Sequence, residues 1–308
     1  MEALKTLNLT ELVEKNKSFC QLGKVANYIP ELDKANPNDF GVCILDMDNN
    51  EYCIGDYEKK FTIQSISKIV TLMLALLDNG SDYVFSKVGM EPSGDPFNSI
   101  RKLETSSRKK PYNPMINAGA IAVSSMIKGD DGRHKFQRLL DFFRQIVEDD
   151  QIDVNYKIYI GESETGNRNR SMGYFLKSEG IIKGDVEEAL DIYFKQCSIE
   201  VTARNIAKLG LFLARNGATS TGEQLVPYKI IRIIKTLMFT CGMYDKSGEF
   251  AVKVGLPSKS GVGGGIVSVV PGKLGIGIYS PALDEKGNPL AGTKFLEDFT
   301  EIFDFRVL

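Results

Sequence analysis

The sequence predicts a mixed α/β fold of the α+β type: an antiparallel sheet formed by the N- and C-terminal segments, flanked by helices, plus a helical insertion. Strand-like runs stand near the start of the 308 residues and again in the last quarter, whereas the middle has helical periodicity. No internal repeat, low-complexity tract or linker separates these regions. Because every strand and helix must bury an apolar face against another element, we expect the two ends to share one sheet.

The first part of the chain predicts a helix and then a hairpin. A helical pattern runs through the N-terminal stretch and stops near Gly23. Two strand-like runs, Phe40–Leu45 and Glu51–Ile54, flank Asp48-Asn49-Asn50, a turn composition that joins antiparallel strands. These two runs would supply the N-terminal strands of the sheet.

Helices are predicted for the middle of the chain. One segment has apolar residues at helical spacing, namely Phe136, Leu139, Leu140, Phe143, Ile146 and Val147. Thr202 stands where a second helix begins, and Asn216-Gly217 ends it. Pro227 stands where a third helix begins, since proline fits the first position of a helix.

The C-terminal segment returns to strands. Three runs are predicted as strands, at Phe250–Gly255, Gly265–Val270 and Leu274–Tyr279. The turn Pro271-Gly272-Lys273 joins the last two. A final helix over roughly Gly292–Phe303 completes the pattern.

The composition excludes several classes of function. The chain has 38 Lys and Arg against 40 Asp and Glu, a net charge of −2, which gives no electrostatic case for binding nucleic acid or an anionic membrane. The longest apolar stretch, Ile69–Leu77, is too short to cross a bilayer, and the N-terminus lacks the apolar core of a signal peptide. We therefore expect a cytoplasmic protein.

The rare residue types narrow the chemistry further. His134 is the single histidine, and its charged surroundings predict an exposed turn, so nearly all histidine-dependent catalysis is excluded. The five cysteines are an odd number without a CxxC pair, which indicates neither a disulfide framework nor a zinc site. Cys43 and Cys53 are interpreted as small buried apolar residues. Asp46–Asn50 lacks the glycine and glutamate of a calcium loop, so we expect no metal.

The strongest chemical motif is Ser65-Ile66-Ser67-Lys68, which opens an apolar helical run ending at Asn79-Gly80. Residues three apart on a helix share a face, so Lys68 could remove the proton of the Ser65 hydroxyl once desolvation lowers the lysine pKa. The positive end of the helix dipole also favours developing negative charge. A serine that caps a helix beside a surface lysine gives the same pattern, so the motif alone does not distinguish a catalytic pair from a structural one.

Two further segments fit this chemistry. Lys259-Ser260-Gly261 precedes a predicted strand, and a Lys-Thr/Ser-Gly element lines the site of Ser-x-x-Lys hydrolases on an edge strand. Glu162–Asn169 is predicted to be a polar loop, rich in groups that hold the ammonium and carboxylate of an amino acid. A glycine-rich turn and a solvated loop remain the alternatives for these two segments.

Taken together, several segments resemble the serine-dependent glutaminase family, whose fold is that of serine β-lactamases and DD-peptidases. In chain order these segments are Asn27–Leu32, Gln64–Lys68, Asn113–Ile121, Ser163–Asn169, Tyr193–Ser198, Cys241–Gly248 and Gly255–Val262. The resemblance implies one glutaminase catalytic domain over residues 1–308, with a sheet part at about 1–68 and 200–308 and a helical part at about 69–199. It implies no cofactor and a homodimer or homotetramer.

The resemblance also implies a mechanism. Ser65 would attack the side-chain amide of L-glutamine, with Lys68 as its general base, and a glutamyl-Ser65 acyl-enzyme would then be hydrolysed to L-glutamate. Tyr28 and Tyr244 would flank the serine, with Tyr244 passing a proton to the departing ammonia. The amides of Ser65 and Val262 would form the oxyanion hole.

The remaining roles concern the substrate's charged ends. The resemblance implies that Glu162 takes the ammonium, and that Asn117, Asn169 and Tyr193 hold the carboxylate end. A zwitterion needs such a pocket, with one carboxylate and several neutral donors. We add the hypothesis that Lys259 is the cation that keeps Lys68 partly neutral.

Two alternatives stay open. A β-lactamase-like or peptidase-like serine hydrolase would use the same Ser65 and Lys68, although the Glu162–Asn169 segment better suits a small zwitterion. A non-catalytic glutamine-binding protein would keep the pocket without the chemistry, although Ser65, Lys68, Tyr28 and Tyr244 are all present.

Overall fold

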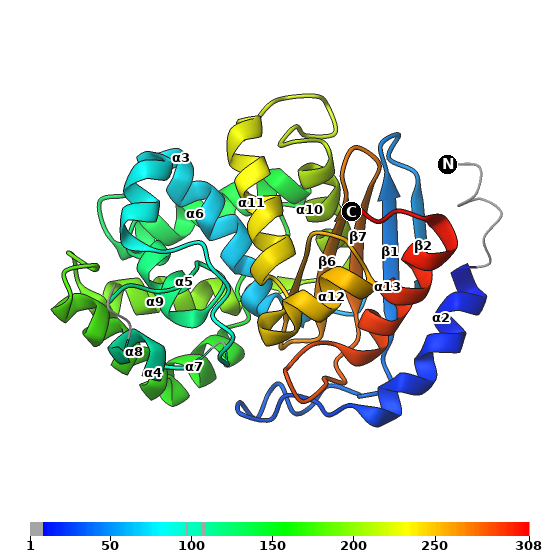
Figure 1. Ribbon diagram of the computed structural model, residues 1–308, viewed down its shortest axis with the longest axis horizontal. Coiled ribbons are helices and arrows are strands. Elements are labelled where there is room, and N and C mark those ends of the chain that lie inside the picture. The colour runs from blue at the N-terminus through cyan, green and yellow to red at the C-terminus, as the bar shows by residue number, and fades with distance from the viewer. Residues whose placement is uncertain (1–8, 97, 106–108, 308) are drawn as a thin grey trace.

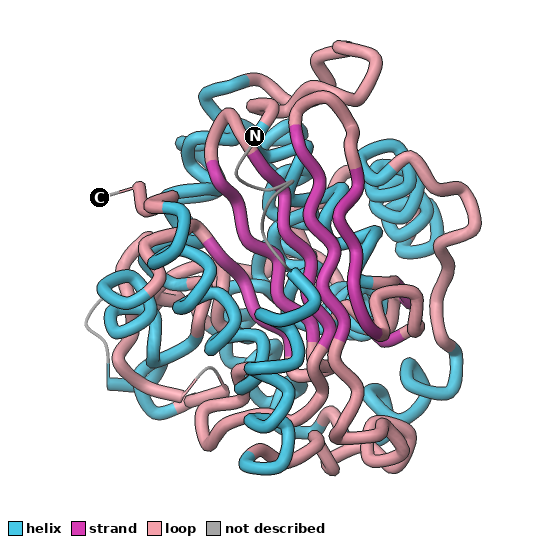
Figure 2. The backbone as a smooth tube through the Cα atoms, turned by 90° about the vertical axis from the view of Figure 1, so that its right-hand side faces the viewer, coloured by secondary structure: helices cyan, strands magenta, loops and turns pink. Residues whose placement is uncertain are grey.

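A five-stranded antiparallel sheet forms the centre of the computed structural model, which describes residues 9–96, 98–105 and 109–307. The strand order is β2-β1-β7-β6-β5, so both ends of the chain contribute, as the sequence predicts. Figure 2 shows the strands lying side by side as one sheet. The bounds are β1 (Gly41–Asp46), β2 (Glu51–Gly55), β5 (Ser258–Gly261), β6 (Gly265–Val270) and β7 (Leu274–Tyr279). β1 pairs with β7, which closes the sheet between segments more than 200 residues apart.

Helices cover both faces of this sheet. One face packs against α2 (Leu9–Lys17), the short 3₁₀ helix η1 (Ser18–Leu22) and α13 (Leu290–Phe303), which lie side by side in Figure 1. The other face packs against α10 (Ala203–Ala214). Gly275 makes this second contact close, because a Cβ there would lie 2.0 Å from the Leu211 amide nitrogen.

The helical part lies beside the sheet (Figure 1). Its elements are α3 (Ser67–Lys87), α4 (Arg101–Thr105), α5 (Asn117–Ser124), α6 (Gly132–Val147), α7 (Tyr156–Thr165), α8 (Asn167–Ser178) and α9 (Val186–Cys197). α11 (Tyr228–Cys241) packs against α3 and β5 and joins the two parts. A short antiparallel pair, β3 (Phe61–Thr62) and β4 (Glu200–Val201), lies where the chain passes between the sheet part and the helical part.

Most predicted elements are confirmed. The hairpin is β1–β2, and the strands predicted at Gly265–Val270 and Leu274–Tyr279 are β6 and β7. Thr202 caps α10 by accepting from the Asn205 amide, and Pro227 precedes α11. The predicted N-terminal helix is α2, and the helical structure ends with η1, directly before Gly23. The part of the prediction that falls on residues 1–8 lies outside the described residues.

The strand predicted at Phe250–Gly255 is wrong. The segment lies instead in and just after the helix α12 (Ser247–Lys253). Phe250 and Val254 are four residues apart and both buried, whereas Glu249 and Lys253 form an exposed ion pair of 2.6 Å. This is helical periodicity, and the run is too short for it to stand out from a strand.

The expectations for Cys43 and Cys53 need correction. These two cysteines are joined by a disulfide, because the β1–β2 register puts them directly opposite each other. Only Cys43 of the two is fully buried.

The apolar helical run is interrupted at Asn79-Gly80, as the sequence predicts, because Gly80 leaves the helical conformation with a φ of +78° and a ψ of 162°. A second helical segment then continues α3 to Lys87.

The single histidine behaves as expected. His134 is exposed at the start of α6, where Asp131 caps the helix by accepting from the His134 amide. Within the described residues, no helix is both long and apolar enough to cross a membrane.

Candidate active site

A cavity of about 260 Å³ lies where the sheet edge meets the helical part. Seven of the residues predicted for the site line it, and these are Tyr28, Ser65, Asn117, Glu162, Asn169, Tyr193 and Val262. Gln64, Arg168 and Cys197 also line it. The chain therefore brings residues as far apart in sequence as Tyr28 and Val262 around one small cavity.

Ser65 lies in the 3₁₀ turn η2 (Gln64–Ile66), which leads directly into α3. The prediction of a helix N-terminus is thus confirmed, with one extra turn of tighter helix. The preceding Gln64 has a φ of +49°, a conformation that residues other than glycine rarely adopt. The edge strand β5 packs against this turn so closely that a Cβ on Gly261 would lie 2.7 Å from the Ile63 carbonyl oxygen.

Lys68 is the second residue of α3 and is buried, with 1% of its surface exposed. Its Nζ donates to the Asn117 Oδ1 at 2.8 Å and to the Met115 carbonyl oxygen at 3.2 Å. Burial lowers the pKa of Lys68 to about 8, although Cys197 and Glu162 oppose this change. In the neutral amine these two acceptors use both hydrogens, which leaves the lone pair to take a proton.

Glu162 supplies a buried carboxylate on the opposite wall. It lies in α7, so the polar loop predicted over Glu162–Asn169 is wrong: the segment is the end of α7 and the start of α8. Its polar composition reflects the cavity and solvent that these two helix ends face. The Tyr28 hydroxyl donates to Glu162 Oε1 at 3.0 Å. Burial raises the Glu162 pKa, and hydrogen bonds from Tyr28 and Gln64 offset part of that rise.

A chain of amides connects the base to the other end of the cavity. Asn117 accepts from Lys68 and donates through Nδ2 to Asn169 Oδ1 at 3.1 Å. Tyr193 is buried beside this pair on α9, and its burial raises its pKa well above the usual value. These groups offer neutral hydrogen-bonding atoms, which suit a carboxylate better than a second carboxylate would.

Tyr244 closes the site from the side of β5. Its hydroxyl lies near Ser65, Ser260 and the backbone amide of Val262. Burial raises the pKa of Tyr244, so it stays protonated at neutral pH. The Lys259 Nζ lies 4.3 Å from the centre of the Tyr244 ring and donates to the Ser260 carbonyl oxygen at 2.5 Å.

Lys259 is fully buried. Burial, with the charge of Lys68 as a second cause, holds its pKa well below the usual value. Its position on β5 confirms that the Lys-Ser-Gly element lies on an edge strand.

Several residues of the cavity wall received no role from the sequence, and two of them contact the predicted site residues. Gln64 stands in the motif Gln64–Lys68, and its side chain reaches both Tyr28 and Glu162. Cys197 stands in the motif Tyr193–Ser198 and lies beside Glu162, and burial raises its thiol pKa to about 12. Membership of these motifs was the available signal for both residues.

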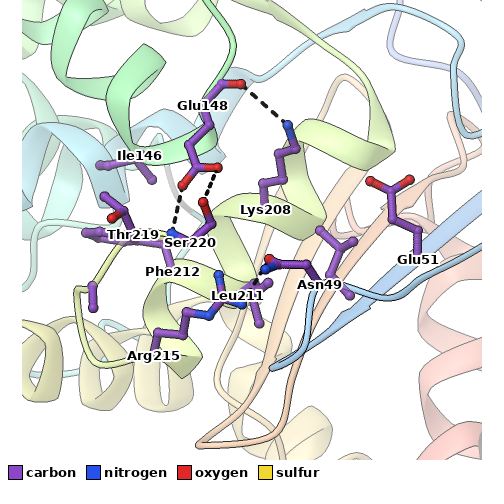
Figure 3. Close-up of a pocket in the computed structure, with 12 residues that line it drawn as sticks. Asn49, Glu51, Ile146, Glu148, Lys208, Leu211, Phe212, Arg215, Thr219 and Ser220 are labelled. Atoms are coloured by element: carbon purple, nitrogen blue, oxygen red, sulfur yellow. Dashed lines mark hydrogen bonds between the residues drawn. The ribbon is translucent and has the colours of Figure 1, made fainter. Parts of the chain in front are cut away.

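A second pocket, of about 230 Å³, lies against the far end of α10. Its polar side chains already serve the loop beyond that helix: Glu148 accepts from the Ser220 amide and hydroxyl, and Arg215 donates to Asn49 (Figure 3). None of the residues predicted for the site lines it. We therefore place the candidate site at the Ser65 cavity.

One group of possible metal ligands occurs in the part of the chain that the structure describes, Cys43, Glu51 and Cys53. The two cysteines of this group are joined to each other, so neither offers a thiolate to a metal.

The fold and the Ser65 cavity place the chain in the β-lactamase-like class. A solved Bacillus subtilis structure described as a probable glutaminase superposes with a TM-score of 0.91 at 37% identity, over 97% of this chain and 96% of that one. The model of the Glutaminase family matches residues 23–308. The chain belongs to the glutaminase family.

Two further relatives are informative. A Fusobacterium nucleatum protein named glutaminase is 70% identical over 292 residues, which cover 95% of this chain and 96% of that one. A B. subtilis glutaminase, 36% identical with a TM-score of 0.89 over 97% of this chain and 98% of that one, was solved as a covalent complex with 5-oxo-L-norleucine formed from 6-diazo-5-oxo-L-norleucine.

Proposed function

We propose that this protein hydrolyses L-glutamine to L-glutamate and ammonia. The observation that carries the proposal is one cavity lined by Ser65 and Glu162, with the buried amine of Lys68 reaching it through Asn117. A nucleophile with a base of lowered pKa suits acyl transfer, and a buried carboxylate beside neutral amides suits a free amino acid. The glutaminase names of the relatives support the same substrate.

The proposed reaction has two steps. Lys68 takes the Ser65 proton as Ser65 Oγ attacks the side-chain amide, and the amides of Ser65 and Val262 stabilise the oxyanion. Tyr244 gives its proton to the amide nitrogen, the C–N bond breaks, and the Lys68 ammonium returns a proton to Tyr244. Water then attacks the glutamyl-Ser65 ester, and the serine proton is restored as glutamate leaves.

The charged ends of the substrate determine how it lies in the cavity. In our proposal Glu162 binds the ammonium, and Asn117, Asn169 and Tyr193 bind the carboxylate. Tyr28 supports the first contact, because its hydrogen bond to Glu162 favours the ionised carboxyl. An incoming ammonium would lower the Glu162 pKa further, so substrate binding and ionisation of Glu162 reinforce each other.

The role of Lys259 stays a prediction. Its place on the face of Tyr244 puts it close to the reacting groups. The burial that lowers its pKa favours a neutral amine, however, which works against the hypothesis that Lys259 acts as a cation on Lys68.

Three broader proposals accompany the reaction. Residues 1–308 would act as one catalytic domain, with the sheet and helical parts meeting at the cavity. The enzyme would work without a cofactor as a cytoplasmic homodimer or homotetramer. Sedimentation analysis of the purified chain tests the assembly directly.

Ammonia release from L-glutamine tests the function, with Ser65→Ala and L-asparagine as parallel controls. We expect release that the alanine variant abolishes. Incubation with 6-diazo-5-oxo-L-norleucine, followed by peptide mass spectrometry, should place the label on the peptide containing Ser65. Nitrocefin turnover without ammonia release would favour a β-lactamase-like enzyme instead. Glutamine binding without turnover by a folded sample would favour the non-catalytic alternative.

A further inference from the structure

A loop outside the recognised motifs holds the turn that carries Tyr244. The φ of Tyr244 is +54°, in the left-handed region that residues other than glycine rarely adopt. Three contacts from the loop Asp284–Asn288 reach the residues on either side: ion pairs Lys246–Asp284 at 3.0 Å and Lys286–Asp245 at 2.9 Å, and the Asn288 amide on the Met243 carbonyl at 3.3 Å. A strained backbone persists only where its surroundings hold it in this way.

The Asn288 side chain is buried and has a single consistent orientation. Its Nδ2 donates to the Met243 carbonyl oxygen, and its Oδ1 accepts from Ser260 Oγ at 2.6 Å. The reverse orientation would put two acceptor oxygens together at Met243, because a carbonyl cannot donate. Oδ1 therefore faces Ser260.

Ser260 fixes this orientation of Asn288. Because an amide oxygen only accepts, Ser260 Oγ donates its hydrogen to Asn288 Oδ1. Asn288 Nδ2 is thereby directed to the Met243 carbonyl oxygen, which belongs to the residue directly before Tyr244. The pair Ser260–Asn288 therefore contacts the backbone where the strained turn begins.

We propose that Asn288 is a positioning residue for catalysis: oriented by Ser260, it holds the turn that carries Tyr244 through the Met243 carbonyl. This deepens the proposed glutaminase function and rests on it. Proton delivery to the leaving ammonia then depends on where this turn holds the Tyr244 hydroxyl. Asn288 acts through these neighbours rather than on the substrate.

The first test is Asn288→Ala, assayed by ammonia release from L-glutamine. We expect kcat to fall about 10–100-fold, since a misplaced reacting group costs that much even when the shift is small. KM should stay within about threefold, because the residues proposed to bind the zwitterion line a different wall. Ser260→Ala should cause a similar loss, and the double variant should be no worse than either single one, because Ser260 acts by orienting Asn288.

The second test uses the isosteric Asn288→Asp, which separates positioning from simple loss of packing. A protonated aspartic acid can donate to the Met243 carbonyl and accept from Ser260, as the amide does, whereas a carboxylate cannot donate. Burial raises the pKa of such a carboxyl. The ratio of variant to unaltered kcat should therefore fall as the pH rises, whereas the ratio for Asn288→Ala should stay flat.

Two matched controls complete the experiment. Ser258→Ala removes an equally buried hydroxyl from the same strand, one that pairs with Ser268 Oγ at 2.7 Å. Lys253→Ala removes an exposed ion pair with Glu249 at 2.6 Å on α12, which is not one of the contacts that hold the Tyr244 turn. Both should keep kcat within about threefold, an effect small against the loss that misplacing a reacting group causes.

Three results would overturn the inference. They are unchanged kcat in Asn288→Ala, equal losses in the two controls, and an Asn288→Asp ratio that does not vary with pH. No ammonia release by the unaltered chain would overturn the proposed function as well, so the two failures are distinct.

Discussion

The ionisation of Lys68 should control how the rate depends on pH. Burial lowers its pKa from 10.5 to about 8. At pH 7 a lysine of pKa 8 is about one-tenth neutral, whereas one of pKa 10.5 is neutral in about one molecule in three thousand. The fold therefore raises the fraction of usable base about 300-fold at neutral pH.

The assay is kcat/KM for ammonia release between pH 5.5 and 9.5, with circular dichroism to confirm the fold at each point. We expect a limb that rises with pH and levels off near pH 8, falling about tenfold for each unit below it, because only neutral Lys68 accepts a proton. Glu162→Gln supplies a matched variant. The negative charge of Glu162 raises the Lys68 pKa, so its removal should move the limb of kcat/KM to lower pH, with a higher KM.

Two outcomes would refute this reasoning. A profile that is flat from pH 6 to 9 would mean that the Lys68 amine is not the titrating base. A limb that moves to higher pH in Glu162→Gln would mean that the two groups do not interact as their burial in one cavity requires. Loss of folding below pH 7 would appear in the dichroism and is thereby separated from titration.

Three further predictions follow from the described contacts. Tyr28→Phe removes the hydroxyl that donates to Glu162, so the Glu162 pKa should rise and KM for glutamine increase about 5–10-fold, measured by initial rates at pH 7; an unchanged KM would contradict this. Gly275→Ala puts a methyl group 2.0 Å from the Leu211 nitrogen and should cost about 3 kcal/mol or more of unfolding free energy in urea, unlike the alanine at unobstructed Gly184. Lys259→Met should leave the acid limb of Lys68 in place, because burial favours neutral Lys259; a shift of the limb to higher pH would instead support its role as a cation.

The order of most elements was accessible from the sequence because its signals are local, whereas the residues that line the Ser65 cavity were grouped through the resemblance to the glutaminase family. The β1–β2 hairpin is predicted by a turn sequence between two apolar runs. The start of α10 is predicted by Thr202, which precedes a run of apolar residues at helical spacing. The prediction of a loop at Glu162–Asn169 failed, because polar residues that face a cavity from two helix ends have the same composition as polar residues in a solvated loop. Cys43 and Cys53 are paired by strand register, and a small error in register at either strand would hide that pairing.

The backbone conformations that local sequence preferences predict least well lie around Ser65. Gln64 and Tyr244 both have positive φ values, +49° and +54°, although neither is a glycine. Such conformations cost about 1–3 kcal/mol each and are kept where neighbours hold them. The first brings the Gln64 side chain to Tyr28 and Glu162, and the second brings the Tyr244 hydroxyl to Ser65. A prediction that assigns each residue its preferred backbone conformation cannot anticipate the positive φ of Gln64 or of Tyr244. For the same reason it cannot identify Asn288, whose contact with the Met243 carbonyl holds the Tyr244 turn.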